Sequence, residues 1–231
     1  VENPAYRETV CTLKYSAAMR YIDHKHPAIV AFSKEQAGDG SPRERAVRLF
    51  SAVRDALRYD PYSISLAPDD HRASAVLASG KGFCVSKAVV LAAVLRAAGF
   101  QARIGFADVR NHLTTPKLRA LMGSDEFIYH GYTELALDGQ AHKLTPAFDR
   151  ALCKRFGVRP LDWDGEGDAL FHPFDQQGRA HMEYLRDHGT RDDLPFEEMM
   201  SAYRRAYPLM FDPVRRAQVL ASQHADRFTA S

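Results

Sequence analysis

At the centre of this chain stands the stretch Gly80-Lys81-Gly82-Phe83-Cys84-Val85-Ser86-Lys87-Ala88, which continues as Val-Val-Leu-Ala-Ala-Val-Leu-Arg-Ala-Ala to Gly99. The two glycines predict a turn, and the alanines, valines and leucines after Cys84 predict a helix. Gly99 stands where a left-handed residue commonly ends a helix. A helix that is apolar on almost every face is a buried one, so we expect it at the core of the fold.

Cys84 opens this predicted helix. The first N–H groups of a helix lack intrahelical partners and carry partial positive charge, which stabilises a thiolate. The pKa of the Cys84 thiol should therefore fall from ~8.5 towards neutrality. The same N–H groups could hold the oxyanion of a tetrahedral intermediate. Cys84 is thus either a nucleophile or, like most free cysteines, a small buried apolar residue.

Upstream of this stretch, Ser41-Pro42-Arg43-Glu44 reads as a capping box, and the apolar spacing after it predicts a helix ending near Tyr59-Asp60-Pro61. A short helix is expected over 73–78. Downstream, residues 101–107 alternate as a strand, and 111–123 look like an inserted excursion with a short helix after Thr115-Pro116.

Residues 127–137 are rich in aromatic and β-branched side chains, which predicts a strand. Asp138-Gly139 predicts a hairpin, with 142–144 as the returning strand. His130 lies inside the first of these strands, which should pack beside the Cys84 helix. A strand histidine alone is more often a satisfied core residue than a catalytic base. Asp149 lies just past the returning strand, so the chemical order is Cys, His, Asp.

Three motifs together resemble the transglutaminase-like superfamily over roughly residues 45–150. They are Gly82-Phe83-Cys84 with its helix, the Leu95–Arg103 turn that matches the family's LR-x-x-G-x-x-A-R, and the strand His130-Gly131-Tyr132-Thr133-Glu134. The resemblance implies an α+β, papain-like fold in which a nucleophile helix packs on an antiparallel sheet, with helical additions at both ends. It also implies a catalytic triad of Cys84, His130 and Asp149, with Gly82, Phe83 and Tyr132 shaping the site.

The chain departs from the family's pattern at two places. Tyr132 stands where tryptophan is commoner, and Thr145-Pro146-Ala147 stands where the family usually reads D-P-T with a catalytic aspartate. Asp149 follows four residues later. Either Asp149 orients His130, which we favour, or the Thr145 hydroxyl does so, or the triad is incomplete.

This resemblance implies acyl transfer on amide bonds through a thioester, most simply hydrolysis by a peptidase or amidase. Transamidation, which cross-links proteins on the same triad, is the first alternative. A non-catalytic binding module that keeps the fold is the second, and Thr145 is the feature that favours it. We expect a peptide or amide substrate and no cofactor, while the oligomeric state stays open.

Composition excludes several other classes. The 231 residues carry 31 Lys and Arg against 29 Asp and Glu, a net charge of +2 that favours neither nucleic acid nor an anionic membrane. Three scattered cysteines argue against a disulfide framework and for a reducing, cytoplasmic setting. Cys11 and Cys153 read as packing residues. No run approaches a membrane span, and the first residues lack a signal pattern, although without an initiating Met a trimmed signal peptide stays open.

No metal site is expected. His24-Lys25-His26 lacks a further ligand, and Asp162–Asp168 resembles a calcium loop only weakly because the glutamate at the twelfth position is missing. We expect a single domain over 1–231, with residues 151–231 as an extension on the core. In that extension we expect helices after Pro195 and over 213–231.

Overall fold

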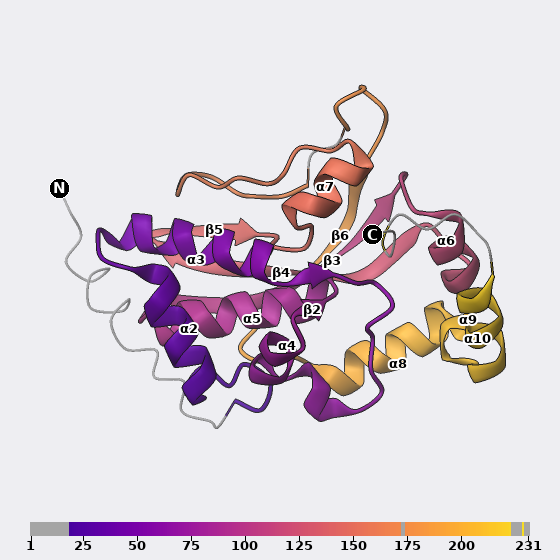
Figure 1. Cartoon of the computed structure of the whole chain (residues 1–231), viewed down its shortest axis with the longest axis horizontal. Helices are drawn as coiled ribbons and strands as arrows, with labels where there is room; N and C mark the ends of the chain where they lie inside the picture. The colour runs from indigo at the N-terminus through magenta and orange to yellow at the C-terminus, as the bar shows by residue number, and fades with distance from the viewer. Residues whose placement is uncertain (1–18, 172–173, 223–227, 229–231) are drawn as a thin grey trace.

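The fold is a four-stranded antiparallel sheet with helices around it (Figure 1). It is seen in a computed structural model that describes residues 19–171, 174–222 and 228. The strand order is β5-β4-β3-β6. The helix α5 (Cys84–Ala97) packs on the two central strands and lies along one face of the sheet in Figure 1. The predicted α+β class, with a nucleophile helix on an antiparallel sheet, is confirmed. The strands are β3 (Gln101–Asn111), β4 (Glu126–Leu137), β5 (Gln140–Leu144) and β6 (Met182–Arg191).

The helix α5 is buried along nearly its whole length, as its composition predicts. Every residue from Cys84 to Arg96 is buried, including Lys87, whose side chain is fully enclosed. The Lys87 Nζ donates to the carbonyl groups of Arg54 (2.8 Å) and Leu57 (2.6 Å), at the end of the helix α3 (Pro42–Ala56). These carbonyls have no intrahelical partner, so the buried amine ties the two helices together.

Local signals locate most of the helices correctly. In α3 (Pro42–Ala56) the Ser41 side chain accepts from the Glu44 N–H, and the Glu44 carboxylate accepts from the Ser41 N–H, which confirms the capping box. The turn between β4 and β5 has positive φ at both Asp138 and Gly139, as an Asp-Gly hairpin requires. The other predicted helices are present as α4 (Ala73–Ser79), α6 (Pro116–Met122), α8 (Phe196–Ala206) and α10 (Pro213–Ala221).

Several elements were not expected from the sequence. Two short strands, β1 (Arg58–Tyr59) and β2 (Lys81–Gly82), pair in parallel and hold the loop before Cys84 against the segment after α3. The strand β6 adds to the edge of β3, so the part of the chain after residue 150 supplies one strand of the sheet. The further unexpected elements are the helices α2 (Pro27–Ala37), α7 (Arg150–Phe156) and α9 (Pro208–Phe211) and a 3₁₀ turn at Pro68–His71.

The C-terminal helices gather at one end of the molecule. There α9 and α10 lie beside α6, the helix of the excursion between β3 and β4 (Figure 1).

His24 and His26 have local roles: the His24 ring contacts the Ile22 carbonyl, and the His26 ring accepts from the Ala28 N–H at the start of α2. Within the described ranges no helix is long and apolar enough to cross a membrane, and no cluster of three metal-binding side chains occurs. Cys11 lies outside the described residues.

Candidate active site

The start of α5 is fixed by a close approach of the backbone at Gly82. The Ser86 Oγ accepts from the Phe83 N–H (2.9 Å) and donates to the Phe83 carbonyl (3.1 Å), which closes the first turn. A Cβ at position 82 would lie 2.5 Å from that Oγ, so only glycine leaves this space free. Gly82 and Phe83 therefore set where the helix begins, and with it the position of Cys84.

The sulfur of Cys84 lies between α5 and β4. The N–H groups of Gly131, Val85 and Cys84 itself face the sulfur and favour its ionised form. A Cβ at position 131 would lie 2.6 Å from the Cα of Val85, so only glycine lets β4 approach the helix this closely. Gly131 directly follows His130. The strand β4, which carries His130, therefore packs beside α5, which begins at Cys84, as predicted.

Burial dominates the protonation of both groups. Cys84 is 6% exposed, and desolvation raises the pKa of its thiol to about 11, although the three N–H groups oppose the rise. The predicted fall in this pKa is wrong, because the cost of burying a thiolate exceeds the gain at the helix start. Desolvation also lowers the pKa of His130 to about 4. At neutral pH both side chains are therefore uncharged.

The His130 imidazole lies in an apolar setting. It is 3% exposed, its ring packs against Phe171 with centroids 5.4 Å apart, and its Nε2 has no hydrogen-bond partner within the described part of the chain. An unpartnered ring nitrogen in a buried position is uncommon. The nitrogen is therefore free to accept a proton at the moment of a reaction.

The residue before His130 has a strained backbone. Tyr129 has φ of 51°, which an aromatic residue rarely adopts, beside an irregularity in the pairing of β3 with β4. Its N–H donates to the Asp108 Oδ1 (3.0 Å), which also contacts the His188 Nε2 (2.7 Å). The His188 ring stacks on the Tyr129 ring, with centroids 4.7 Å apart. These contacts hold the chain conformation that leads into His130.

Asp149 is placed differently from the expected triad member. It is the N-cap of α7: its Oδ1 accepts from the Leu152 N–H (2.8 Å), and its Oδ2 accepts from the Tyr59 N–H (2.9 Å). Both carboxylate oxygens are thus bound to backbone groups, and among the described residues neither bonds to the His130 ring. Residues 145–149 form a loop after β5, and this loop leads directly into α7.

Thr145 lies on the same face as His130. The pairing of β4 with β5 ends at Thr133 and Leu144, so the next residue falls beside Tyr132, two positions from His130. Thr145 is 1% exposed, and its hydroxyl lies against the Tyr184 hydroxyl. This chain therefore has a buried threonine hydroxyl at the place where the family pattern has an aspartate.

Tyr132 packs against the sheet. Its ring lies over Gly105, where a Cβ would come 2.2 Å from the Tyr132 Cζ, and its hydroxyl donates to the Asp187 Oδ1 (3.1 Å). Tyr132 does not line the cavity at Cys84. Its contacts join β4 to β3 and β6.

Tyr184 was not expected at the site, because it comes from β6. Its hydroxyl accepts from the Phe171 N–H (3.3 Å), and burial raises its pKa to about 12. The Thr145 hydroxyl lies near enough to lower this pKa, and Cys84 is among the groups that raise it. Tyr184 thus brings a second hydroxyl to the region of Thr145 and His130.

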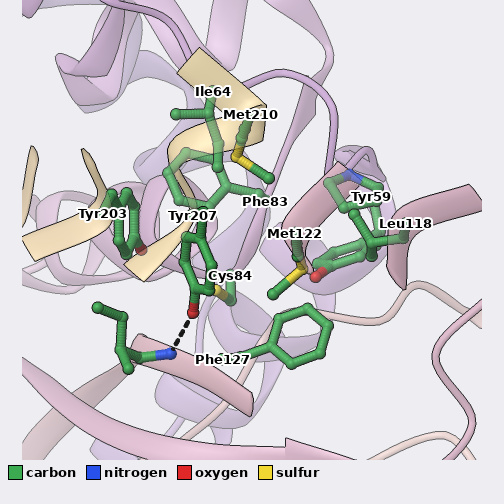
Figure 2. A pocket seen from close by; sticks show the side chains of 12 residues that line it. Tyr59, Ile64, Phe83, Cys84, Leu118, Met122, Phe127, Tyr203, Tyr207 and Met210 are labelled. Carbon is green, nitrogen blue, oxygen red and sulfur yellow. Dashed lines mark hydrogen bonds between the residues drawn. The ribbon is translucent and has the colours of Figure 1, made fainter. Parts of the chain in front are cut away.

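Cys84 also lines a small, partly open cavity with about 30 Å³ of enclosed free space (Figure 2). The walls come from the β1 region, α5, α6, β4, α8 and α9, and they contain no charged side chain. His130 is not part of these walls. The lining residues are Tyr59, Pro61, Ile64, Phe83, Cys84, Leu118, Met122, Phe127, Ile128, Tyr203, Tyr207 and Met210.

This chain was compared with solved structures, curated proteins and family models. Two solved structures are similar: a candidate protease from Parabacteroides distasonis (20% identity, TM-score 0.37, 51% of this chain and 22% of that one) and a candidate cysteine protease from Cytophaga hutchinsonii (14% identity, TM-score 0.42, 74% and 50%). This chain thus spans at most half the length of either. No match was found among curated proteins. A family model for the transglutaminase-like superfamily matches residues 30–142, which include Cys84 and His130. Over this segment, just under half of the chain, the protein is therefore similar to the transglutaminase-like superfamily.

Proposed function

We propose that this protein is a thiol-dependent hydrolase of amide bonds, with Cys84 as nucleophile and His130 as general base. The observation that carries the proposal is the position of the sulfur, which lies at a helix start and is faced by the N–H of the residue after His130. The unpartnered Nε2 of His130 supports it, because a base must have a free nitrogen.

The proposed reaction begins from the neutral pair. His130 takes the proton of the Cys84 thiol as the sulfur attacks the amide carbon, and the oxyanion is held by backbone N–H groups at the start of α5. The C–N bond then breaks, and the amine leaves with the proton from His130. Water attacks the resulting thioester, giving its proton to His130, and a carboxylic acid and the free thiol are released.

The third member of the site has two candidates. Asp149 would have to give up a backbone hydrogen bond to orient His130, whereas the Thr145 hydroxyl is bound to no backbone group in the structure and lies beside Tyr184. We therefore propose Thr145, with Tyr184 beside it, as the orienting group. Thr145→Val should lower kcat more than it changes KM, while Asp149→Ala, measured per folded molecule, should retain kcat. The reverse result would return the role to Asp149.

The test of the main proposal is a fluorogenic peptide amide with trapping of the intermediate. Wild-type protein should release the amine and form an acyl adduct that mass spectrometry maps to Cys84. Cys84→Ala should lower turnover by on the order of 10⁴ or more. Buried Cys153 serves as the internal control, because its sulfur lies near the Phe148 carbonyl (3.9 Å) away from the site. Full turnover in Cys84→Ala would disprove the mechanism.

A non-catalytic binding module is the second candidate, favoured by the lack of an orienting partner for the His130 Nε2 among the described residues. A module would bind peptide but form no acyl adduct, and Cys84 would react with amide probes no faster than Cys153. Adding a primary amine to the assay separates the two enzymatic outcomes. Formation of the new amide in place of the acid would identify transamidation.

A further inference from the structure

We infer that Asp108 and His188 are positioning residues for His130: they hold Tyr129 in the strained backbone conformation of a β-bulge, and this bulge sets where the next side chain lies. The inference rests on the proposed function, because it concerns the general base of the same reaction. His188 lies on β6, outside the residues that match the family model, so the later part of the chain acts on the site.

The bulge lies where β4 enters the site. In the pairing of β3 with β4, Ala107 lies opposite His130. The next pair is Val109 with Phe127, so one residue of β3 spans two of β4. A bulge of this kind bends its strand and re-aims the side chains beside it. The second of the two residues is Tyr129, whose φ of 51° lies in the left-handed region where bulges commonly carry glycine. A side chain keeps such a conformation only where its surroundings hold it.

Asp108 is the residue of β3 opposite the bulge, and its side chain acts on the Tyr129 backbone. Its Oδ1 accepts from the Tyr129 N–H (3.0 Å) and from the His188 Nε2 (2.7 Å). The His188 ring lies nearly flat on the Tyr129 ring, with 19° between the ring planes. The side chains of His188 and Asp108 are 16% and 18% exposed, so their hydrogen bond is largely shielded from water. Two strands, β3 and β6, thus hold the backbone and the ring of one residue.

The other contacts of Tyr129 come from α8 and provide a control. Its hydroxyl donates to the Glu198 Oε1 (2.7 Å), and its carbonyl accepts from the Tyr203 hydroxyl at 3.4 Å. Glu198 is exposed and contacts the tip of the side chain, away from the strained backbone. Its loss should therefore leave the bulge in place, which makes Glu198→Ala the matched control for the loss of Asp108.

The first test measures kcat and KM for the fluorogenic peptide amide, per folded molecule. Asp108→Ala should lower kcat roughly 10- to 100-fold with KM nearly unchanged, because a misplaced base slows proton transfer and leaves substrate binding intact. Asp108→Asn keeps an oxygen that accepts from the Tyr129 N–H, so its kcat should stay near the wild-type value. Glu198→Ala should also keep kcat. An unchanged kcat in Asp108→Ala, or an equal loss in Glu198→Ala, overturns the inference.

Rescue distinguishes positioning from a general loss of structure. Glycine adopts a φ near 51° without strain, so adding Tyr129→Gly to Asp108→Ala should recover most of the lost kcat. His188→Ala should lower kcat in the wild-type background but not further in Asp108→Ala, because both residues act through Tyr129. Additive losses, or no recovery with Tyr129→Gly, contradict the inference. If Asp108→Ala does not fold, His188→Ala takes its place in the comparisons with Glu198→Ala and Tyr129→Gly.

A readout that needs no turnover separates this inference from the proposed function. Burial lowers the pKa of the His130 ring to about 4, and a ring displaced towards water should titrate at higher pH. NMR titration, with the ring signal assigned by comparison with His130→Gln, should give a His130 pKa at least about one pH unit higher in Asp108→Ala than in Glu198→Ala. If the wild-type protein cleaves no amide, the proposed hydrolysis fails, while this difference still supports the positioning. Equal pKa values in the two variants reject it.

Discussion

The Cys84 sulfur and the His130 imidazole are both uncharged at neutral pH, since burial raises one pKa to about 11 and lowers the other to about 4. This differs from cysteine enzymes whose resting state is a thiolate–imidazolium pair. In the reaction that we propose, proton transfer is therefore coupled to attack on the substrate, as in serine hydrolases. A neutral pair in a dry site is also stable without counter-charges, which agrees with the apolar surroundings of His130.

Alkylation measures this protonation directly. We expect the rate of Cys84 modification by iodoacetamide to rise about tenfold per pH unit between pH 7 and 9.5, because only the thiolate reacts and the thiol pKa lies above this range. Peptide mapping separates Cys84 from the other cysteines. A rate that is already at its plateau at pH 6 would instead indicate a resting ion pair.

Asp149 makes a prediction about stability. Asp149→Ala removes a helix N-cap and leaves the buried Tyr59 N–H unbonded, which together should lower the free energy of unfolding by roughly 2–4 kcal/mol. Urea denaturation checks this value. Thr145→Val is the matched comparison, because its hydroxyl meets only the Tyr184 hydroxyl and binds no backbone group, so the exchange should change stability by about 1 kcal/mol or less.

At the scale of elements, two glycines control how the site is assembled. Gly131 lets β4 reach α5, and Gly82 lets the first turn of α5 close. Gly131→Ala should be the more damaging change, because its Cβ would meet the Val85 backbone, whereas the Cβ of Gly82→Ala would meet the rotatable Ser86 side chain. We expect a loss of roughly 3 kcal/mol or more for Gly131→Ala and about 1–2 kcal/mol for Gly82→Ala. Thermal unfolding of both variants tests the order.

Tyr207 links the C-terminal helices to β4. Tyr207→Phe leaves the Ile128 N–H and the Glu126 carbonyl without their partner, so stability should fall by roughly 1–3 kcal/mol. Because Tyr207 also lines the cavity at Cys84, KM for the peptide amide should rise while kcat changes little. A fall in kcat with unchanged KM would contradict this assignment.

Sequence patterns located the elements whose signals are local. The capping box of α3, the Asp-Gly hairpin and the glycine after α5 act within a few residues, and all three are present. The strand β6 was missed because it is an exposed edge strand with a polar sequence and little alternation. The helix α7 did carry a signal: Asp149 as N-cap and Gly157 in the left-handed conformation at its end.

The site could be predicted only in part, because some of its features follow from local signals and others depend on distant segments. The meeting of β4 with the Cys84 helix followed from local elements in their family order, and the structure contains it. The protonation of Cys84 and His130 could not be predicted, because it depends on how completely distant segments bury them. Two polar contacts were equally non-local: Tyr184 comes from β6, and the Asp149 Oδ2 accepts from the N–H of Tyr59 on β1.

At the scale of the whole molecule, burial of histidine predicts how stability depends on pH. The pKa of His130 is about 4 in the folded state against ~6.5 in the unfolded chain, so the unfolded chain binds more protons between these values. The free energy of unfolding should therefore fall as the pH drops through this window, by at most roughly 3 kcal/mol from His130. His130→Gln should flatten the curve measured by urea denaturation from pH 7 to pH 4. An equally steep curve in that variant would assign the effect to other groups.

The uncharged resting state of Cys84 also bears on survival under oxidative conditions. Peroxides attack the thiolate, so a sulfur that is ionised only during turnover presents almost nothing for them to react with. Under the proposed function, the protein without substrate should therefore withstand hydrogen peroxide doses that inactivate cysteine enzymes with a permanent ion pair, and should become sensitive only during turnover.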